Sequence, residues 1–245
     1  MYFDYSEYNS NNILLDQETG VLPGLAASWR YQWPQWFVTV DLDYHEGNVD
    51  YEGQTQSGTP LATTTGTYVT NLRFMGGRTF SGIAGTESSL YAGAGYHYWY
   101  RDINPGTDVI GTPVAGLLEI YQWTFAILGT ELGLVDTPTT RLALDIRAKY
   151  LMRGTMDIDF QGFLGIDNTQ VNLGTDWSFR LGIPLTFALN KTSRLVIEPY
   201  YDTWDIPKSN VVELTRNGVP TGIGVLEPRS ETRNIGISFL YRAHF

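Results

Sequence analysis

The chain has 245 residues, a net charge of −10 at neutral pH and no cysteine. The negative charge argues against nucleic acid as a partner, since a phosphate backbone is bound mainly by Lys and Arg. Without cysteine there is neither a disulfide framework nor a thiolate metal site, and no other motif indicates a metal or a cofactor. Charged residues make up only 17% of the chain, against about 25% in a typical soluble domain.

The predicted elements are β-strands. In residues 36–44, the apolar side chains from Trp36 to Tyr44 alternate with Thr39, Asp41 and Asp43. Alternate side chains of a strand point to opposite faces, so this segment has one apolar and one polar face. The same alternation predicts ten strands, in chain order near residues 2–9, 22–32, 36–50, 66–80, 88–102, 116–134, 140–157, 173–188, 193–206 and 231–245.

The segments are long enough for tilted transmembrane strands, which need roughly 9–11 residues. A membrane helix would need roughly 20 consecutive apolar residues, and no run in the chain approaches that length. Segment 116–134 is the least regular, because both of its faces are largely apolar. We expect a bulge near Gly129 to exchange its two faces.

The connections between these segments alternate in length. Short ones lie near Pro34, Gly82, Pro138 and Lys191. Long ones, rich in Gly, Thr, Asn, Asp and Pro as solvated loops are, lie at 10–21, 54–65, 104–114, 161–170 and 207–230. This alternation, with both termini on the side of the short turns, is typical of an even-stranded meander closed on itself.

The fold class that follows is all-β. We predict one domain over residues 1–245, a transmembrane up-and-down antiparallel β-barrel of about ten strands with short periplasmic turns and long extracellular loops. The alternative is a soluble β-sandwich or soluble barrel whose apolar face forms the core. The length of the segments and the many charges on their polar faces argue against it.

Aromatic residues gather toward both ends of the predicted strands, as they do at the two boundaries of a membrane. Near the short turns they are Trp33, Trp36, Phe80, Phe187 and Phe245, and toward the long loops they are Tyr44, Tyr68, Tyr96, Tyr98 and Tyr100.

The last segment, NIGISFLYRAHF, places Ile237, Phe239, Tyr241 and Phe245 on one face. In this it resembles bacterial outer-membrane β-barrel proteins, in which a final strand ending in Phe is read by the barrel-assembly machinery. The resemblance implies a multi-pass protein of a Gram-negative-type outer membrane, surrounded by lipid and lipopolysaccharide. It also implies that Phe245, Tyr241 and Phe239 form the assembly signal.

The polar faces are predicted to line the interior of the barrel. Opposite charges fall on adjacent strands, and a barrel of about eight to ten strands has little free space, so these side chains are expected to form a salt-bridged plug. The alternative is a narrow conduit in which Arg and Lys favour anions. The predicted lumen charges are Arg30, Asp41, Arg73, His97, Arg101, Asp145, Arg147, Lys149, Arg153, Arg180, Glu198, Asp202 and Arg242.

One constellation of residues has the chemistry of a hydrolytic site. Asp43 can orient His45, which would activate water, and Asp157 with Asp159 can hold that water or a cationic substrate at the same rim. The arrangement loosely resembles the omptin family of outer-membrane proteases, in which an Asp–His pair faces an Asp–Asp pair. The order of the two pairs along the chain is reversed here. His97, by contrast, is expected to pack against aromatic neighbours.

For function, the sequence favours a non-enzymatic barrel that binds an unknown extracellular or periplasmic ligand in surface binding or adhesion. The predicted binding loops are 52–66, 103–115 and 207–230. A narrow channel for small polar or anionic solutes is the first alternative, and an omptin-like protease is the second.

Overall fold

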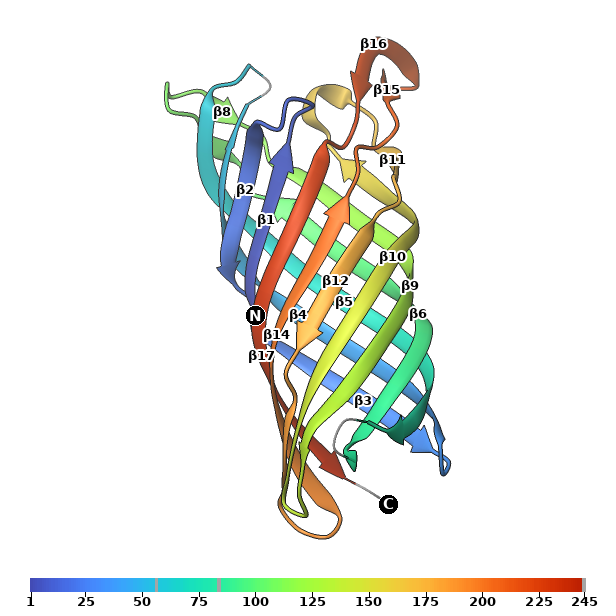
Figure 1. Cartoon of the computed structure of the whole chain (residues 1–245). Helices are drawn as coiled ribbons and strands as arrows, with labels where there is room; N and C mark the ends of the chain where they lie inside the picture. Colours follow the sequence, from blue (N-terminus) through green and yellow to red (C-terminus); the bar gives the residue numbers. More distant parts are fainter. Residues whose placement is uncertain (56, 83–84, 244–245) are drawn as a thin grey trace.

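The computed structural model describes all residues except 56, 83–84 and 244–245. The described residues form a closed ring of ten antiparallel strands (Figure 1), and the predicted barrel is confirmed. The strands of the ring are β1 (Tyr2–Tyr8), β2 (Leu14–Val21), β3 (Gly24–Gln32), β4 (Trp36–Gln54), β5 (Pro60–Ser81), β6 (Glu87–Ile103), β9 (Leu117–Asp136), β10 (Thr140–Asp159), β11 (Thr169–Leu173), β12 (Trp177–Gly182), β13 (Leu185–Ala188), β14 (Ser193–Ile206) and β17 (Arg229–Ala243).

Two positions in the ring are occupied by interrupted strands. β2 and β3 both pair with β4 in one continuous register and are separated at Pro23. β11, β12 and β13 all pair with β10, and Pro184 separates the last two. Proline has no backbone N–H to donate to a ladder, which explains why the strand assignment breaks at these two points.

One end of the barrel carries short turns and the other carries longer loops, which we call the turn end and the loop end. Two hairpins project at the loop end outside the ring (Figure 1). They are β7–β8, formed by Gly106–Thr107 and Pro113–Val114, and β15–β16, formed by Val212–Arg216 and Val219–Val225. A short 3-10 turn lies at Phe163–Gly165.

Two predicted loops prove to be mostly strand. Most of 10–21 belongs to β2, and the connection to β1 is a tight turn in which the Asn9 side chain accepts the N–H groups of Asn11 and Ile13 at 2.9 and 3.0 Å. The predicted loop 52–66 likewise extends β4 and β5, leaving a tip near 55–59. The alternation in β2 was missed because its inward positions are acidic.

The predicted bulge near Gly129 is wrong. Gly129 pairs regularly with Tyr91 and Arg147, and a Cβ there would lie 2.5 Å from the Tyr91 ring. The register of the β9–β10 ladder shifts instead at Leu134 and at Met152. The shift at Leu134 lies near the turn end. The shift at Met152 changes which side chains of β10 face inward between Met152 and the loop end.

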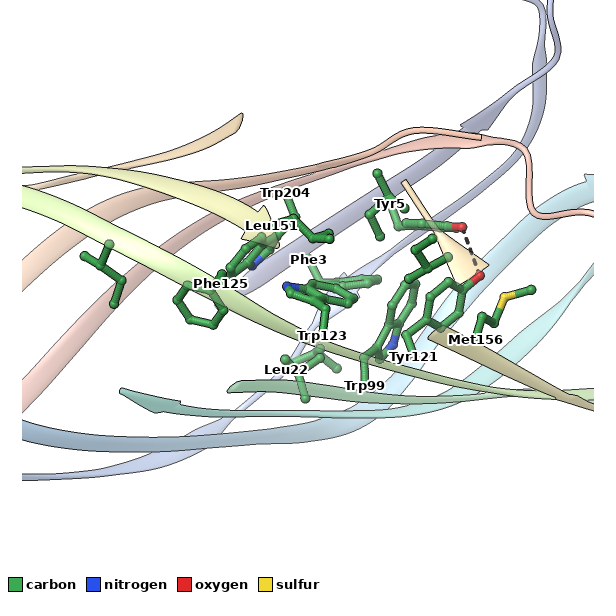
Figure 2. Packing of buried hydrophobic residues seen from close by; sticks show 14 of the residues in the cluster. Phe3, Tyr5, Leu22, Trp99, Tyr121, Trp123, Phe125, Leu151, Met156 and Trp204 are labelled. Carbon is green, nitrogen blue, oxygen red and sulfur yellow. Dashed lines mark hydrogen bonds between the residues drawn. The ribbon is translucent and has the colours of Figure 1, made fainter. Parts of the chain in front are cut away.

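An aromatic core fills the interior toward the loop end (Figure 2). Trp99 stacks on Tyr121 with ring centroids 4.6 Å apart, and Trp204 lies edge-on to Trp123 at 5.2 Å and to Phe125 at 4.9 Å. Besides the predicted salt-bridged side chains, the interior therefore contains a packed aromatic core. This core explains why β9 is apolar on both faces.

The outer face of the wall exposes large apolar side chains, among them Leu25 at 82% and Phe239 at 68%. Tyr241 is exposed on the same face, while Phe245 lies outside the described residues. A contiguous apolar exterior of this kind is what a lipid-facing wall requires. In the described part of the chain, no helix is long and apolar enough to cross a membrane.

The amino terminus lies part-way up the wall instead of at the turn end, where it was predicted (Figure 1). The Met1 ammonium group donates a hydrogen bond of 2.6 Å to the carbonyl oxygen of Leu22, beside the break between β2 and β3. β1 consequently separates β17 from β2 only in the half of the barrel that leads to the loop end.

Candidate functional site

A buried charge cluster sits inside the barrel near the loop end. Arg101 is only 1% exposed, and its guanidinium contacts carboxylates from three other strands. Nη1 lies 3.0 Å from Glu7 and 2.5 Å from Glu119, Nε lies 2.9 Å from Glu18, and Nη2 lies 3.5 Å from Asp16. β1, β2, β6 and β9 are thereby joined at one point, as only a closed barrel allows.

A fifth carboxylate enters this cluster from a loop. Glu227 lies between β16 and β17 and accepts hydrogen bonds from the hydroxyls of Tyr5 at 3.1 Å and Tyr121 at 2.9 Å. Its backbone N–H donates to Ser209 Oγ at 2.8 Å, and the Ser209 N–H donates to the Glu227 carbonyl at 3.0 Å. Both ends of the loop 207–228 are thus fastened over the mouth of the barrel.

The charges of the cluster do not balance. Five carboxylates against one guanidinium leave an excess of four negative charges if all are ionised. Asp16 Oδ1 and Glu18 Oε2 are buried and have no hydrogen-bond partner among the described residues. Burial, together with the neighbouring Glu7 and Glu119, raises the pKa of Glu227 well above the usual range of a carboxyl group. The arrangement can therefore hold a proton at the loop carboxyl.

Most of this cluster was missed by sequence reasoning, which selected Arg101 alone. Glu7 and Glu119 lie on the inward faces of segments that were correctly predicted as strands, so their alternation could have indicated them. Asp16 and Glu18 were assigned to a loop. Nothing local marks Glu227, because its position depends on how the loop folds back.

A second set of charges lies inside the barrel toward the turn end, where ions pair within a strand or with a strand one or two positions away. Their contacts are Arg73 with Asp43 and, at 3.9 Å, with Asp41; Arg147 with Asp145 at 2.5 Å; Lys149 with Asp202 at 2.8 Å; and Arg180 with Glu198 at 2.9 Å. The Arg73 and Arg180 pairs are partly exposed, whereas Asp145 and Lys149 are buried, and the set as a whole is nearly balanced in charge.

Three predicted lumen charges stand apart from these pairs. Arg30 faces inward with its guanidinium 3.7 Å above the Phe37 ring, and Arg242 shares the inward parity of β17. Neither forms an ion pair with any described residue. Arg153 is not in the lumen, which corrects its prediction: the register shift at Met152 turns it to the exposed outer face.

The structure does not bring the proposed hydrolytic residues together. Asp43 and His45 lie 4.0 Å apart, but they face the interior of the barrel where β4 pairs with Gly24 and Ala26, well below the rim. Asp157 and Asp159 alternate with the buried Met156 and Ile158, so they face outward. Asp157 accepts hydrogen bonds from the flanking Gln122 and Gln170 at 3.2 and 2.6 Å. The expected common rim is therefore corrected.

His97 behaves as predicted, since its ring stacks on Trp123 with centroids 3.9 Å apart. Its Nδ1 lies 2.7 Å from the Asn71 side-chain oxygen, and Asn71 also donates to Asp43 at 2.8 Å. The histidine thus links the aromatic core to the ion pairs below it. Within the described ranges, no three His, Asp or Glu side chains are grouped so that they could hold a metal ion.

Apolar side chains are also exposed on the loops above the wall. A shallow, open cleft of about 380 Å³ lies beside the β15–β16 hairpin, and its lining mixes apolar and polar groups. Its lining residues are Ile166, Leu214, Arg216, Val219, Pro220, Thr221 and Ile223. Further apolar side chains are exposed on other loops, including Val109, Ile110 and Leu164.

The architecture is shared with a solved membrane protein. The outer membrane protease OmpT from Escherichia coli superposes with a TM-score of 0.68 at 8% sequence identity, over 99% of this chain and 92% of that one. The chain has the fold of the outer-membrane β-barrels. At this identity the likeness concerns the fold alone.

Two other solved structures are more distant. The β domain of the Bordetella autotransporter BrkA is 13% identical, with 100% of this chain and 97% of that one covered. A deletion mutant of TodX, a monoaromatic hydrocarbon channel, is 9% identical, with 96% and 64% covered. Their TM-scores are only 0.38 and 0.35, and no argument rests on them. Neither a protein-family model nor a curated protein matches the sequence.

Proposed function

We propose that the protein is embedded in the outer membrane of a Gram-negative-type bacterium, with the loop end outside the cell and the turn end in the periplasm. The barrel fold and the apolar outer wall support this placement. Two levels of outward aromatic residues also support it: Trp29, Tyr31 and Trp33 in mutual ring contact toward the turn end, and Tyr44, Tyr68, Tyr98 and Tyr100 in contact higher on the wall. Lipopolysaccharide and the barrel-assembly machinery are the partners that follow.

At the cell surface, the protein acts as a binding or adhesion module. The observation that carries this proposal is the exposure of apolar side chains on the loops, with Val219 at 64% and Ile223 at 60%, at the edge of the open cleft. Solvated loops gain nothing from such residues, whereas a contact surface does. The partner therefore presents a complementary apolar surface to the β15–β16 hairpin.

The two alternatives receive less support from the geometry. A channel needs an open bore, but the aromatic core and the Arg101 cluster occupy the interior near the loop end. A protease of the kind considered needs the Asp43–His45 pair and the Asp157–Asp159 pair at one site, and these pairs face opposite sides of the wall.

Adhesion of whole cells to polystyrene, an apolar probe surface, tests the proposal. We expect cells that produce the protein to be retained several-fold more than cells that lack it. The double variant Val219→Asp/Ile223→Asp should lose most of this gain. Ser10→Asp/Asn11→Asp is the matched control, because it adds the same charge to an exposed polar turn at the same end.

Folding of both variants is checked by the heat-dependent gel mobility of intact barrels. Retention that is equal in cells with and without the protein contradicts the proposal, as does equal loss in the two folded variants.

A further inference from the structure

A second pocket lies at the loop end, between the β1–β2 turn and the two ends of the loop 207–228 (Figure 1). It is shallow and open, has a volume of about 270 Å³, and has no described lining residue in common with the cleft beside the β15–β16 hairpin. Drug-sized ligands occupy pockets of roughly 300–1,000 Å³. This pocket therefore fits one small molecule or the end group of a longer one.

Both charged side chains that line the pocket are positive. They are Lys208 and Arg229, and among the described lining residues there is no Asp or Glu. Lys208 forms no ion pair in the part of the chain that the structure describes. Arg229 contacts Glu231, but Glu231 also binds Arg233, and both arginines interact with Asp205 on the wall below. On a protein with a net charge of −10, two cations that share their carboxylates with a third favour an anionic ligand.

The uncharged polar groups of the lining are mainly hydrogen-bond donors. The side-chain oxygen of Asn9 already accepts the N–H groups of Asn11 and Ile13, so its NH₂ group is left without a partner among the described residues. The oxygen of Asn12 accepts a long hydrogen bond of 3.5 Å from Arg229, and its NH₂ group is likewise unpaired within the described ranges. These amides can donate to hydroxyl oxygens of a ligand.

The rest of the lining is largely apolar. Tyr8 borders the pocket with a half-buried ring, and the apolar side chains beside it are Leu15, Leu226 and Pro228. A sugar presents C–H groups on the face of its ring and hydroxyls at its edge, so an aromatic ring next to amide donors suits it. A phosphate monoester carries about −1.5 to −2 charges at neutral pH, which the two lining cations can balance.

The pocket is held in shape by the attachment of the loop 207–228. Lys208 precedes Ser209, and Leu226 and Pro228 flank Glu227. The reciprocal backbone and side-chain hydrogen bonds between Ser209 and Glu227 therefore fix the lining residues on this side. A site whose walls are ordered before binding loses less conformational entropy when the ligand arrives.

The height of the pocket favours a soluble ligand over the headgroup of a membrane lipid. On β1, β2 and β17, the apolar outer wall ends at one row of the ladders, formed by Tyr2, Val21 and Ile235. Arg229 is six residues beyond Ile235 on β17, which is roughly 20 Å along the strand. For strands tilted by about 35–45°, this corresponds to about 14–16 Å along the membrane normal. The headgroup region on each side of a bilayer is only about 5–8 Å thick.

We propose that this pocket binds a soluble sugar that carries a phosphate monoester. The phosphate accepts hydrogen bonds from Lys208 and Arg229, the sugar hydroxyls accept from the amides of Asn9 and Asn12, and the apolar face of the sugar contacts Tyr8. The site is separate from the apolar surface of the β15–β16 hairpin. Only the choice of a soluble ligand over a lipid headgroup rests on the proposed placement in the membrane.

Isothermal titration calorimetry on the refolded 245-residue protein, in micelles of a neutral detergent, tests the proposal. The probe is glucose 6-phosphate, and glucose and inorganic phosphate are the matched probes. We expect glucose 6-phosphate to bind at least ten-fold more tightly than either. Equal affinities for the three probes, or no binding to barrels shown to be folded by gel mobility, overturn the proposal.

Substitutions locate the binding. Lys208→Glu should weaken the binding of glucose 6-phosphate at least ten-fold, whereas Lys191→Glu, the same change at an exposed lysine of the turn end, should leave it unchanged. Tyr8→Leu should weaken the binding of glucose 6-phosphate several-fold without changing that of inorganic phosphate. Equal losses in the two lysine variants would mean that the net charge of the protein, and not the pocket, determines the binding.

Two variants from the adhesion test separate this site from the hairpin surface. Ser10→Asp/Asn11→Asp adds negative charge at the rim of the pocket, so it should weaken the binding of glucose 6-phosphate several-fold while adhesion to polystyrene is retained. Val219→Asp/Ile223→Asp should lose adhesion and keep the binding of glucose 6-phosphate. Loss of both properties in either folded variant would contradict a separate site.

Nanodiscs distinguish a soluble ligand from a lipid headgroup. The titration is repeated in discs of phosphatidylcholine and in discs that also contain phosphatidylinositol 4-phosphate, a lipid with a phosphate monoester on a ring of hydroxyl groups. We expect the same affinity for glucose 6-phosphate in both. A several-fold lower affinity in the second discs would mean that the headgroup competes for the pocket, and would overturn the assignment of a soluble ligand.

Discussion

The two halves of the barrel interior differ in how their charged side chains are paired and buried. Near the turn end, cations and carboxylates pair roughly one to one, and Arg180 keeps 18% of its side chain exposed. Near the loop end, one arginine that is 1% exposed holds several carboxylates on the loop side of the aromatic core. Partly solvated pairs contribute little to stability, whereas removing one partner from a buried cluster leaves uncompensated charge. We therefore expect the same residue types to contribute differently to the stability of the barrel in the two halves.

The largest expected effect comes from Arg101→Met. Removing the guanidinium leaves at least four carboxylates buried around an apolar side chain, and we expect a loss of about 3–5 kcal/mol in the free energy of unfolding. Urea unfolding in micelles, followed by Trp fluorescence, measures it. Arg180→Met in the other half is the matched control and should cost clearly less, because it leaves a single, partly exposed carboxylate without its partner. Equal losses would mean that the two halves do not differ as described.

Trp123→Ala tests the aromatic core in the same assay. The side chain is 2% exposed and contacts His97 and Trp204, so its removal should cost about 3–5 kcal/mol through lost burial and the cavity left behind. Trp29→Ala, on the lipid-facing wall, should cost clearly less. If the two substitutions are equivalent, the interior near the loop end is not packed as a core.

Glu227→Gln should change the pH dependence with which the loop 207–228 stays attached to the barrel. The pKa of Glu227 is raised in the folded protein, so its folded state holds the proton more tightly than its unfolded state. The stabilising contribution is fully present below the unfolded pKa and is lost as pH rises toward the folded pKa. We expect proteolysis of the loop 207–228 to accelerate several-fold with rising pH in the native protein.

The glutamine variant should show a weaker dependence on pH over the same range. A native loop that becomes more resistant to protease as the pH rises would contradict the assigned direction.

His45→Ala should have the smallest effect. Because Asp157 and Asp159 face outward, His45 has no partner site for peptide hydrolysis. Native protein and variant should both release fluorophore from a quenched cationic peptide at the background rate. Cleavage by the native protein that His45→Ala abolishes would restore the protease hypothesis.

The outer wall of the barrel could be predicted from the sequence, whereas the contacts in its interior could not. Alternation over two residues is a local signal, so the lipid-facing side chains from Trp36 to Tyr44 and the ring of ten strands could be predicted. The alternation no longer predicts which face a residue occupies once the register shifts, because the bulge at Met152 exchanges the inward and outward faces of β10 beyond that residue. Arg153, Asp157 and Asp159 were misplaced for that reason.

The contacts across the interior depend on closure of the barrel, which no local pattern encodes. Arg101 reaches Glu18 and Glu7, which are 83 and 94 residues away in the chain. The stagger of the strands decides which inward side chains meet at one height. The aromatic core could have been anticipated from the apolar inward face of β9, but only once the position of its bulge was known.

Single-channel conductance of the refolded protein in a planar bilayer tests the central claim most directly, which is that the core and the Arg101 cluster close the bore. We predict no stable openings in moderate salt for barrels whose folding is verified by heat-dependent mobility. Steady openings whose ion selectivity changes in Arg147→Glu or Arg180→Glu would contradict the claim and would make the protein a narrow channel.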